Sequence, residues 1–149
     1  MKSFLNIMFW SILSTIGTSS CKSKASEPSI PPIQNVWTVL EVKENNVVVY
    51  ARGASNNIKP SYERFRLELR AGSVLSMTDL DRVTSTGTWA ISPDQKALTL
   101  SNLNPVPTGT GGSIIFTVEE LNSSMLSIHR ITSSPKTGGT QNFYRLTNK

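Results

Sequence analysis

The sequence predicts an all-β domain that folds as an antiparallel, up-and-down barrel of eight or nine strands. Short segments rich in β-branched and aromatic residues follow one another with turn residues between them, and no window of a dozen residues has helical spacing. So many strands in about 115 residues must close on themselves, because open sheet edges invite aggregation. Periodicity alone leaves a two-sheet sandwich open as an alternative.

The first half of the domain predicts a hairpin and then a strand with two distinct faces. Residues 36–42 are rich in Val and Thr, and the turn cluster that begins at Glu44 returns the chain into residues 47–52. Residues 63–70 alternate, with Phe65 and two leucines on one face and charged side chains on the other. One face of this strand is expected in the core and the other in water.

The second half predicts more short strands separated by turns and two longer loops. The turn around Pro93 and Asp94 joins two of these strands as a second hairpin, since Pro favours the second position of a turn. The loops at residues 102–112 and 132–142 are separated by one hairpin, so an up-and-down barrel would place both at the same end. The predicted strands are residues 74–77, 87–91, 97–100, 113–119, 125–131 and 143–147.

The N-terminus predicts a lipoprotein signal peptide over residues 1–20. Lys2 precedes an apolar run at residues 4–16, which as a helix is about 20 Å long and too short for the ~30 Å core of a bilayer. Small residues then lead into Cys21, the one cysteine of the chain. The segment resembles a relaxed bacterial lipobox, with Thr18 where an apolar residue is usual. This resemblance implies an acylated, palmitate-bearing Cys21 and an anchor in the cell envelope, in the outer membrane facing the periplasm.

The rest of the chain divides into a tether and one domain. Residues 21–34 are polar and proline-bearing, which is typical of an extended tether, and residues 35–149 are long enough for a single core. The formal net charge of +5 is spread along the sequence without runs of like charge, so no nucleic-acid partner is expected. A single cysteine also argues against zinc or redox motifs.

Several segments resemble the lipocalin-like domains of bacterial envelope lipoproteins. The resemblance covers residues 35–147 and includes Trp37 in the first strand, the run 64–69, Gly87-Thr88-Trp89 and the closing Tyr144-Arg145-Leu146. Asn35 stands where lipocalins carry the glycine of a Gly-x-Trp motif. The resemblance implies an eight-stranded barrel. It also implies that Arg145 covers the ring of Trp37 and closes the barrel base.

Large aromatic residues supply the predicted interior. They either fill the barrel or line a cavity for a small apolar molecule, and the sequence leaves both open. These candidate ligand-binding residues are Trp37, Phe65, Trp89 and Phe116.

The chemistry-bearing residues form no recognisable catalytic or metal-binding constellation. His129 is the one histidine and has no ligands at metal spacing, and Asp79 and Asp81 lack a calcium-loop pattern, so they are expected to be solvated. Glu119 and Glu120 are expected on opposite faces of a strand. The glycine-rich stretch 109–112 precedes a strand, whereas a phosphate-binding loop precedes a helix.

The sequence therefore predicts a non-enzymatic envelope protein without a cofactor or metal. Its leading function is the binding of a small apolar ligand inside the barrel. The alternative is a protein-interaction or inhibitor module with a filled barrel that uses its loops or exterior. An enzyme would need a site that the sequence does not show.

Overall fold

The computed structural model describes residues 32–149. The predicted signal peptide, Cys21 and the first part of the tether lie outside the described residues. Within residues 32–149, no helix is long and apolar enough to cross a bilayer.

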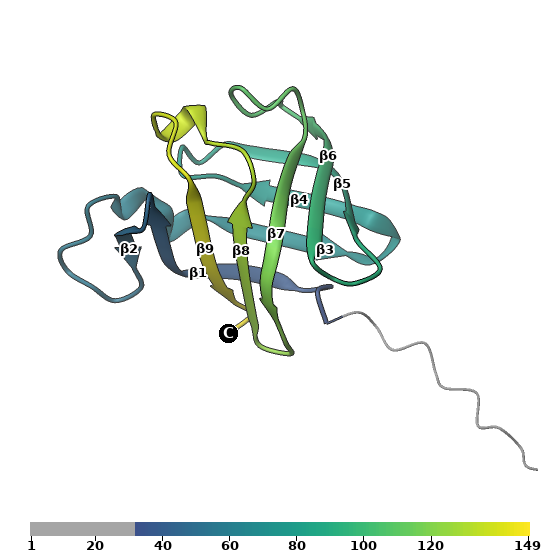
Figure 1. The fold of residues 1–149 in the computed structure, drawn as a ribbon, viewed down its shortest axis with the longest axis horizontal. Helices are drawn as coiled ribbons and strands as arrows, with labels where there is room; N and C mark the ends of the chain where they lie inside the picture. Colours follow the sequence, from purple (N-terminus) through teal and green to yellow (C-terminus); the bar gives the residue numbers. More distant parts are fainter. Residues whose placement is uncertain (1–31) are drawn as a thin grey trace, which may run out of the picture.

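The domain is a closed antiparallel barrel, as the sequence predicted. Eight strands form the ring in the order β1-β3-β4-β5-β6-β7-β8-β9, pairing of β1 with β9 closes it, and β2 is an extra strand beside β1 (Figure 1). Apart from β2, each strand pairs with the next one along the chain, which is the up-and-down arrangement. The strands are β1 (Val36–Glu44), β2 (Val47–Ala51), β3 (Arg66–Arg70), β4 (Val74–Thr78), β5 (Thr84–Ile91), β6 (Ala97–Asn104), β7 (Ile114–Leu121), β8 (Met125–Arg130) and β9 (Asn142–Thr147).

Strand β1 is long because it has two successive partners on one side. Its first residues, from Val36 to Thr38, pair with β3, and its last residues, from Glu41 to Glu44, pair with β2. The turn between β1 and β2 consists of Asn45 and Asn46, both with positive φ (48° and 67°). Two such residues form the tight turn that suits the twist of a hairpin, and Asn tolerates this conformation well.

The outer edge of β2 is covered by the chain that follows it. The Asn57 side chain accepts a hydrogen bond from the Ala51 amide (2.7 Å) and donates one to the Ala51 carbonyl (3.1 Å), as a neighbouring strand would. The Lys59 amide donates to the carbonyl of Val49 at 2.9 Å. These bonds satisfy backbone groups on the outer edge of the extra strand, so this edge is protected from pairing with another strand. The candidate site described below lies in the barrel itself.

Between β2 and β3 the structure differs from the sequence prediction in where a strand begins. The sequence predicts a strand that starts at Glu63, but a 3-10 helix, η1 (Pro60–Arg64), occupies this position. Proline at the first turn of a helix loses no hydrogen bond, which favours the helical turn here. The predicted alternation holds from Phe65, two residues later, which is buried, and β3 begins at Arg66.

Strand β6 is also longer than predicted and shortens the loop that follows. Its pairing with β5 continues to Asn104 across an irregularity at Gly87. A Cβ atom on Gly87 would lie 2.4 Å from the carbonyl oxygen of Ser101, so only glycine allows this approach of the two backbones.

One core fills the ring, because every strand points alternate residues inward. It is made of leucines and aromatic residues with smaller contributions from Val, Ile and Met. Its largest fully buried members are Trp37, Tyr62, Ile33, Leu67, Leu69, Leu75, Met77, Leu98, Leu100, Leu103, Leu126 and Ile128.

Candidate functional site

A loop crosses one end of the barrel; we call residues 131–141, between β8 and β9, the strap. It contains a short 3-10 helix, η3 (Pro135–Thr137), and is pinned at its base by a bridge between Ser134 and Thr140. Lys136 reaches Asp79 (2.9 Å) and Asp81 (2.8 Å) in the loop between β4 and β5. Because β4 lies across the ring from β8, the strap spans this end of the barrel.

The strap also contacts the loop between β6 and β7. A Cβ atom on Gly109 would lie 2.4 Å from Cγ of Pro135, so the two loops touch at this point. The prediction that these two loops share one end of the barrel is therefore confirmed.

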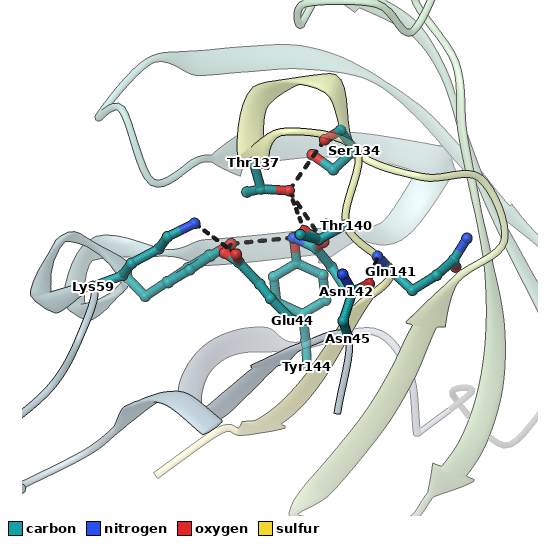
Figure 2. Close-up of polar contacts among 10 residues, drawn as sticks. Glu44, Asn45, Lys59, Ser134, Thr137, Thr140, Gln141, Asn142 and Tyr144 are labelled. Atoms are coloured by element: carbon teal, nitrogen blue, oxygen red, sulfur yellow. Dashed lines mark hydrogen bonds and ion pairs between the residues drawn. The ribbon is translucent and has the colours of Figure 1, made fainter. Parts of the chain in front are cut away.

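Beneath the strap lies a cluster of buried polar side chains centred on Asn142, the first residue of β9 (Figure 2). Its side chain is fully buried and donates to the hydroxyls of Tyr62 (3.1 Å) and Tyr144 (3.2 Å). Its carbonyl oxygen accepts hydrogen bonds from Thr140 (2.8 Å) and Thr137 (3.2 Å) of the strap. Asn142 thus joins the strap to the interior of the barrel.

The buried carboxylate of Glu44 forms the other half of this cluster. It lies at the end of β1 and accepts hydrogen bonds from the hydroxyl of Tyr62 (2.8 Å) and from Lys59 Nζ (2.5 Å) (Figure 2). Glu44 is 6% exposed, so its charge needs these partners. Lys59 and Tyr62 are supplied by η1 and the residue before it, which explains the place of this helix in the fold.

The two tyrosine hydroxyls of the cluster are held in their neutral form. Burial raises the pKa of Tyr62, and the nearby Tyr144 and Glu44 raise it further. Burial also raises the pKa of Tyr144, while the Arg130 charge partly opposes this effect. Both hydroxyls therefore act as hydrogen-bonding groups at neutral pH, and neither is poised to act as a base.

An aromatic cluster lies directly below the polar one. The ring of Tyr144 stacks on Phe65 (centroids 4.6 Å apart) and meets the edges of Tyr62 (6.2 Å) and Phe116 (6.1 Å). Tyr144 belongs to both clusters, because its ring is apolar and its hydroxyl points to Asn142. The interior is therefore apolar along the strands and polar at the strap end.

Charge on the strap gives this end of the barrel a pH dependence. Burial alone would raise the pKa of Asp81, but hydrogen bonds from Lys136 and the Val83 amide lower it below its ordinary value. A carboxyl group with a lowered pKa stabilises the folded state at pH values above its unfolded pKa, and this stability is lost as pH falls through the folded value.

We therefore expect Lys136→Gln to destabilise the domain at pH 7 and to have a smaller effect at pH 3, which is below the ordinary pKa of an aspartate in the unfolded chain. Urea unfolding of the variant and of the parent at both pH values measures the difference. Lys149→Gln, at the chain end, is the control. An effect of Lys136→Gln that is the same at both pH values would contradict the assigned ion pairs.

The structure places the four predicted ligand-binding residues inside the barrel, with exposures of 0–6%. Phe65 and Phe116 belong to the aromatic cluster below the strap. Trp37 and Trp89 lie towards the opposite end, where their indole N–H groups donate to the carbonyls of Ile33 and Arg70 (both 2.9 Å). The strands thus bring two of the four together with Tyr144 and keep the two tryptophans apart from that group.

The predicted contact between Arg145 and Trp37 is wrong. Arg145 is exposed, and the residues on either side of it in β9 are buried, so its side chain points outward. Trp37 is fully buried on the inner face. Among the described residues the cation–π contact is formed instead by Lys43, whose Nζ lies 5.7 Å from the Phe143 ring on the outer face.

The pockets described for residues 32–149 are grooves on the outside of the barrel, and none is lined by the four predicted ligand-binding residues. One of about 370 Å³ surrounds Phe143 and contains Glu119, Glu120 and Arg145. The prediction that Glu119 and Glu120 occupy opposite faces is wrong, because an irregularity in the β7–β8 pairing turns both outward.

The other chemistry-bearing residues have ordinary surroundings. Nδ1 of the half-exposed His129 lies 3.9 Å from Glu119. Asp79 and Asp81 are bound by Lys136, so the expectation that they are merely solvated is wrong. Residues 109–112 precede strand β7, as predicted. In the part of the chain that the structure describes, no three His, Cys, Asp or Glu side chains group as metal ligands.

Sequence reasoning missed the polar residues under the strap. Glu44 lies in a predicted turn and Asn142 in a predicted loop, and Tyr62 lies in a stretch for which the sequence analysis makes no prediction. Arg130 had a usable signal, because it follows Leu126 and Ile128 at a spacing of two, which places it on the inner face of β8. In the structure it is buried, with 6% exposure.

Comparison with known proteins finds two solved structures of partial similarity. No protein-family model and no curated protein matches the chain. Two solved structures resemble it, an uncharacterized protein from Bacteroides eggerthii (11% identity, 77% of this chain and 98% of the other, TM-score 0.45) and a lipocalin-like protein from Bacteroides uniformis (17%, 76% and 97%, TM-score 0.44). The lipoprotein part of the expectation from the sequence stays a prediction.

Proposed function

We propose that this protein is a lipid-anchored protein of the bacterial cell envelope that binds a small, largely apolar molecule in its barrel and catalyses no reaction. One observation supports this most strongly. The barrel ring is closed by backbone ladders, whereas the strap forms backbone bonds to neighbouring elements at its two ends, Ile131 and Gln141. Between these ends it is held by side chains, chiefly Lys136 and Asn142. Side-chain contacts separate at lower cost than a strand pairing, so this end is where a ligand would enter.

The proposed ligand would meet the aromatic cluster first. Phe65, Phe116 and Tyr144 lie just beneath the strap and offer apolar ring surfaces, and Trp37 and Trp89 complete the apolar interior further down. In the closed barrel the rings of Phe65 and Phe116 pack against that of Tyr144. Binding therefore requires the strap to open and the rings to separate, and the ligand replaces ring–ring contacts with contacts to its own chain.

The membrane anchor is a separate part of the proposal. With a cleavable secretion signal in front of it, a chain carrying Cys21→Ser is expected to incorporate no labelled palmitate and to move to the soluble fraction. The reason is that several acyl chains, at about 0.8 kcal/mol per buried CH₂, hold a protein firmly at a membrane. Fractionation and palmitate labelling measure the change. A serine variant that sediments with membranes as the parent does would rule out Cys21 as the anchor.

Ligand binding is tested with 1-decanol, a neutral molecule with an apolar chain. Titration of the purified Cys21→Ser protein, followed by tryptophan fluorescence, is expected to saturate at one molecule per barrel. Lys136→Gln removes the strap's ion pairs and is expected to speed association at least threefold, because opening of the strap precedes entry. Lys149→Gln is the matched control. Non-saturable binding, or an association rate that is the same in Lys136→Gln as in the parent protein, would contradict the proposal.

A second candidate function is a protein-interaction module, supported by the close packing of the interior. Its contact surface would be the outer groove around Phe143, where Lys43 and Arg145 alternate with Glu41 and Glu120. Such mixed charges around an aromatic side chain suit a polar protein surface. Absence of decanol binding, together with loss of partner capture from an envelope extract in Phe143→Ala, would favour this candidate.

A further inference from the structure

Arg130 is a buried cation in the strap end of the barrel that the fold itself does not explain. It is the last residue of β8 and faces inward, in phase with Leu126 and Ile128 and opposite Phe116 of β7. Its side chain is 6% exposed. Its Nε atom is buried and has no hydrogen-bond partner among the described residues.

The carboxylates at this end of the barrel already have partners. Glu44 is bound by Lys59 and the Tyr62 hydroxyl, and Asp79 and Asp81 share Lys136. Arg130 forms no ion pair within residues 32–149. Its positive charge is therefore buried without the partner that such a charge normally needs.

A second donor lies beside it. The Tyr144 hydroxyl accepts a hydrogen bond from Asn142, and in none of the hydrogen bonds described does Tyr144 serve as the donor. Tyr144 pairs with Ile128, two positions before Arg130 on the same face of β8, and its ring meets that of Phe116, the residue paired with Arg130. A guanidinium with its fork of N–H groups and a neutral hydroxyl form a donor set for a carboxylate.

We propose that Arg130, assisted by the Tyr144 hydroxyl, binds the carboxylate of a ligand whose apolar chain occupies the aromatic interior. This inference rests on the proposed ligand-binding function and defines its ligand class as a monocarboxylate with an apolar chain. The carboxylate takes the place beneath the strap, and the chain extends past Phe116 and Tyr144. Arg130 thus determines which apolar molecules are accepted, since a neutral head group would leave its charge unpaired.

The test compares decanoate with 1-decanol, which share a chain and differ in the head group. At pH 7 the protein is expected to bind decanoate at least tenfold more tightly than decanol. Arg130→Gln is expected to bring the two affinities within twofold, because the carboxylate loses its cationic partner. Arg145→Gln, which alters an arginine on the outer face of the adjacent strand, is the control and should retain the preference.

The outcomes separate the two levels of the proposal. Equal binding of decanoate and decanol by the parent protein, or an undiminished preference in Arg130→Gln, overturns the role of Arg130 and leaves the ligand-binding function standing. Failure of both molecules to bind overturns the proposed function and this inference with it.

Urea unfolding of the ligand-free protein tests whether the buried Arg130 charge is unpaired. An unpaired buried charge contributes no stability, so Arg130→Met should unfold in the ligand-free state at a urea concentration equal to or above that of the parent. A clear decrease in the midpoint would show that Arg130 has a structural partner, and this result would also overturn the inference.

Discussion

Trp89→Ala is expected to lower the free energy of unfolding by about 3–5 kcal/mol, because truncation of a buried tryptophan removes apolar contacts and leaves a cavity. Trp89 lies on β5 and is 6% exposed. The substitution also leaves the Arg70 carbonyl without the indole N–H that now bonds to it at 2.9 Å. Urea unfolding followed by circular dichroism measures the loss.

Val74→Ala is the control for this prediction. Val74 lies on the neighbouring strand β4 and is 52% exposed, so its truncation should change the free energy of unfolding by less than about 0.5 kcal/mol. A loss below about 1 kcal/mol for Trp89→Ala would mean that neighbouring side chains fill the space left by the ring with little loss of stability. That result would contradict a tightly packed barrel interior.

Asn142→Ala is expected to cost about 2–4 kcal/mol, because a fully buried amide with four side-chain partners is lost and buried groups are left unsatisfied. The strap should loosen as well, because Thr137 and Thr140 lose their acceptor. Urea unfolding gives the energy, and hydrogen exchange of the strap amides gives the local effect. Asn56→Ala, in an exposed loop, is the control.

Faster exchange confined to the strap, together with the loss of global stability, is the expected pattern for Asn142→Ala. Unchanged exchange in residues 131–141 would contradict the role of Asn142 as the link between the strap and the interior.

The barrel could be predicted from the sequence because its signal is local. Alternating residues such as Phe65, Leu67 and Leu69 report which face of a strand is buried, and turn residues report where the strand ends. The same alternation identifies the inner positions of the four predicted ligand-binding residues. It fails where backbone pairing shifts, as at Glu119 and Glu120, since a bulge breaks the period of two.

The strap end could not be predicted in the same way, because its contacts join segments that are distant in sequence. Lys136 binds Asp79 and Asp81 from across the ring, and Asn142 joins Tyr62 to the strap. No local pattern reports such pairs. The contact between Arg145 and Trp37 was expected from a family resemblance, and the outward direction of Arg145 on β9 contradicts it.

The central claim is that the barrel takes an apolar molecule through its strap end and holds it against the aromatic cluster. Intermolecular nuclear Overhauser effects between the methylene protons of bound decanoate and the protein's aromatic protons test it most directly. We predict contacts from Phe65, Phe116 and Tyr144, and none from Phe143, which lines an outer groove. Contacts to Phe143 alone, with none to the three interior rings, would contradict the account.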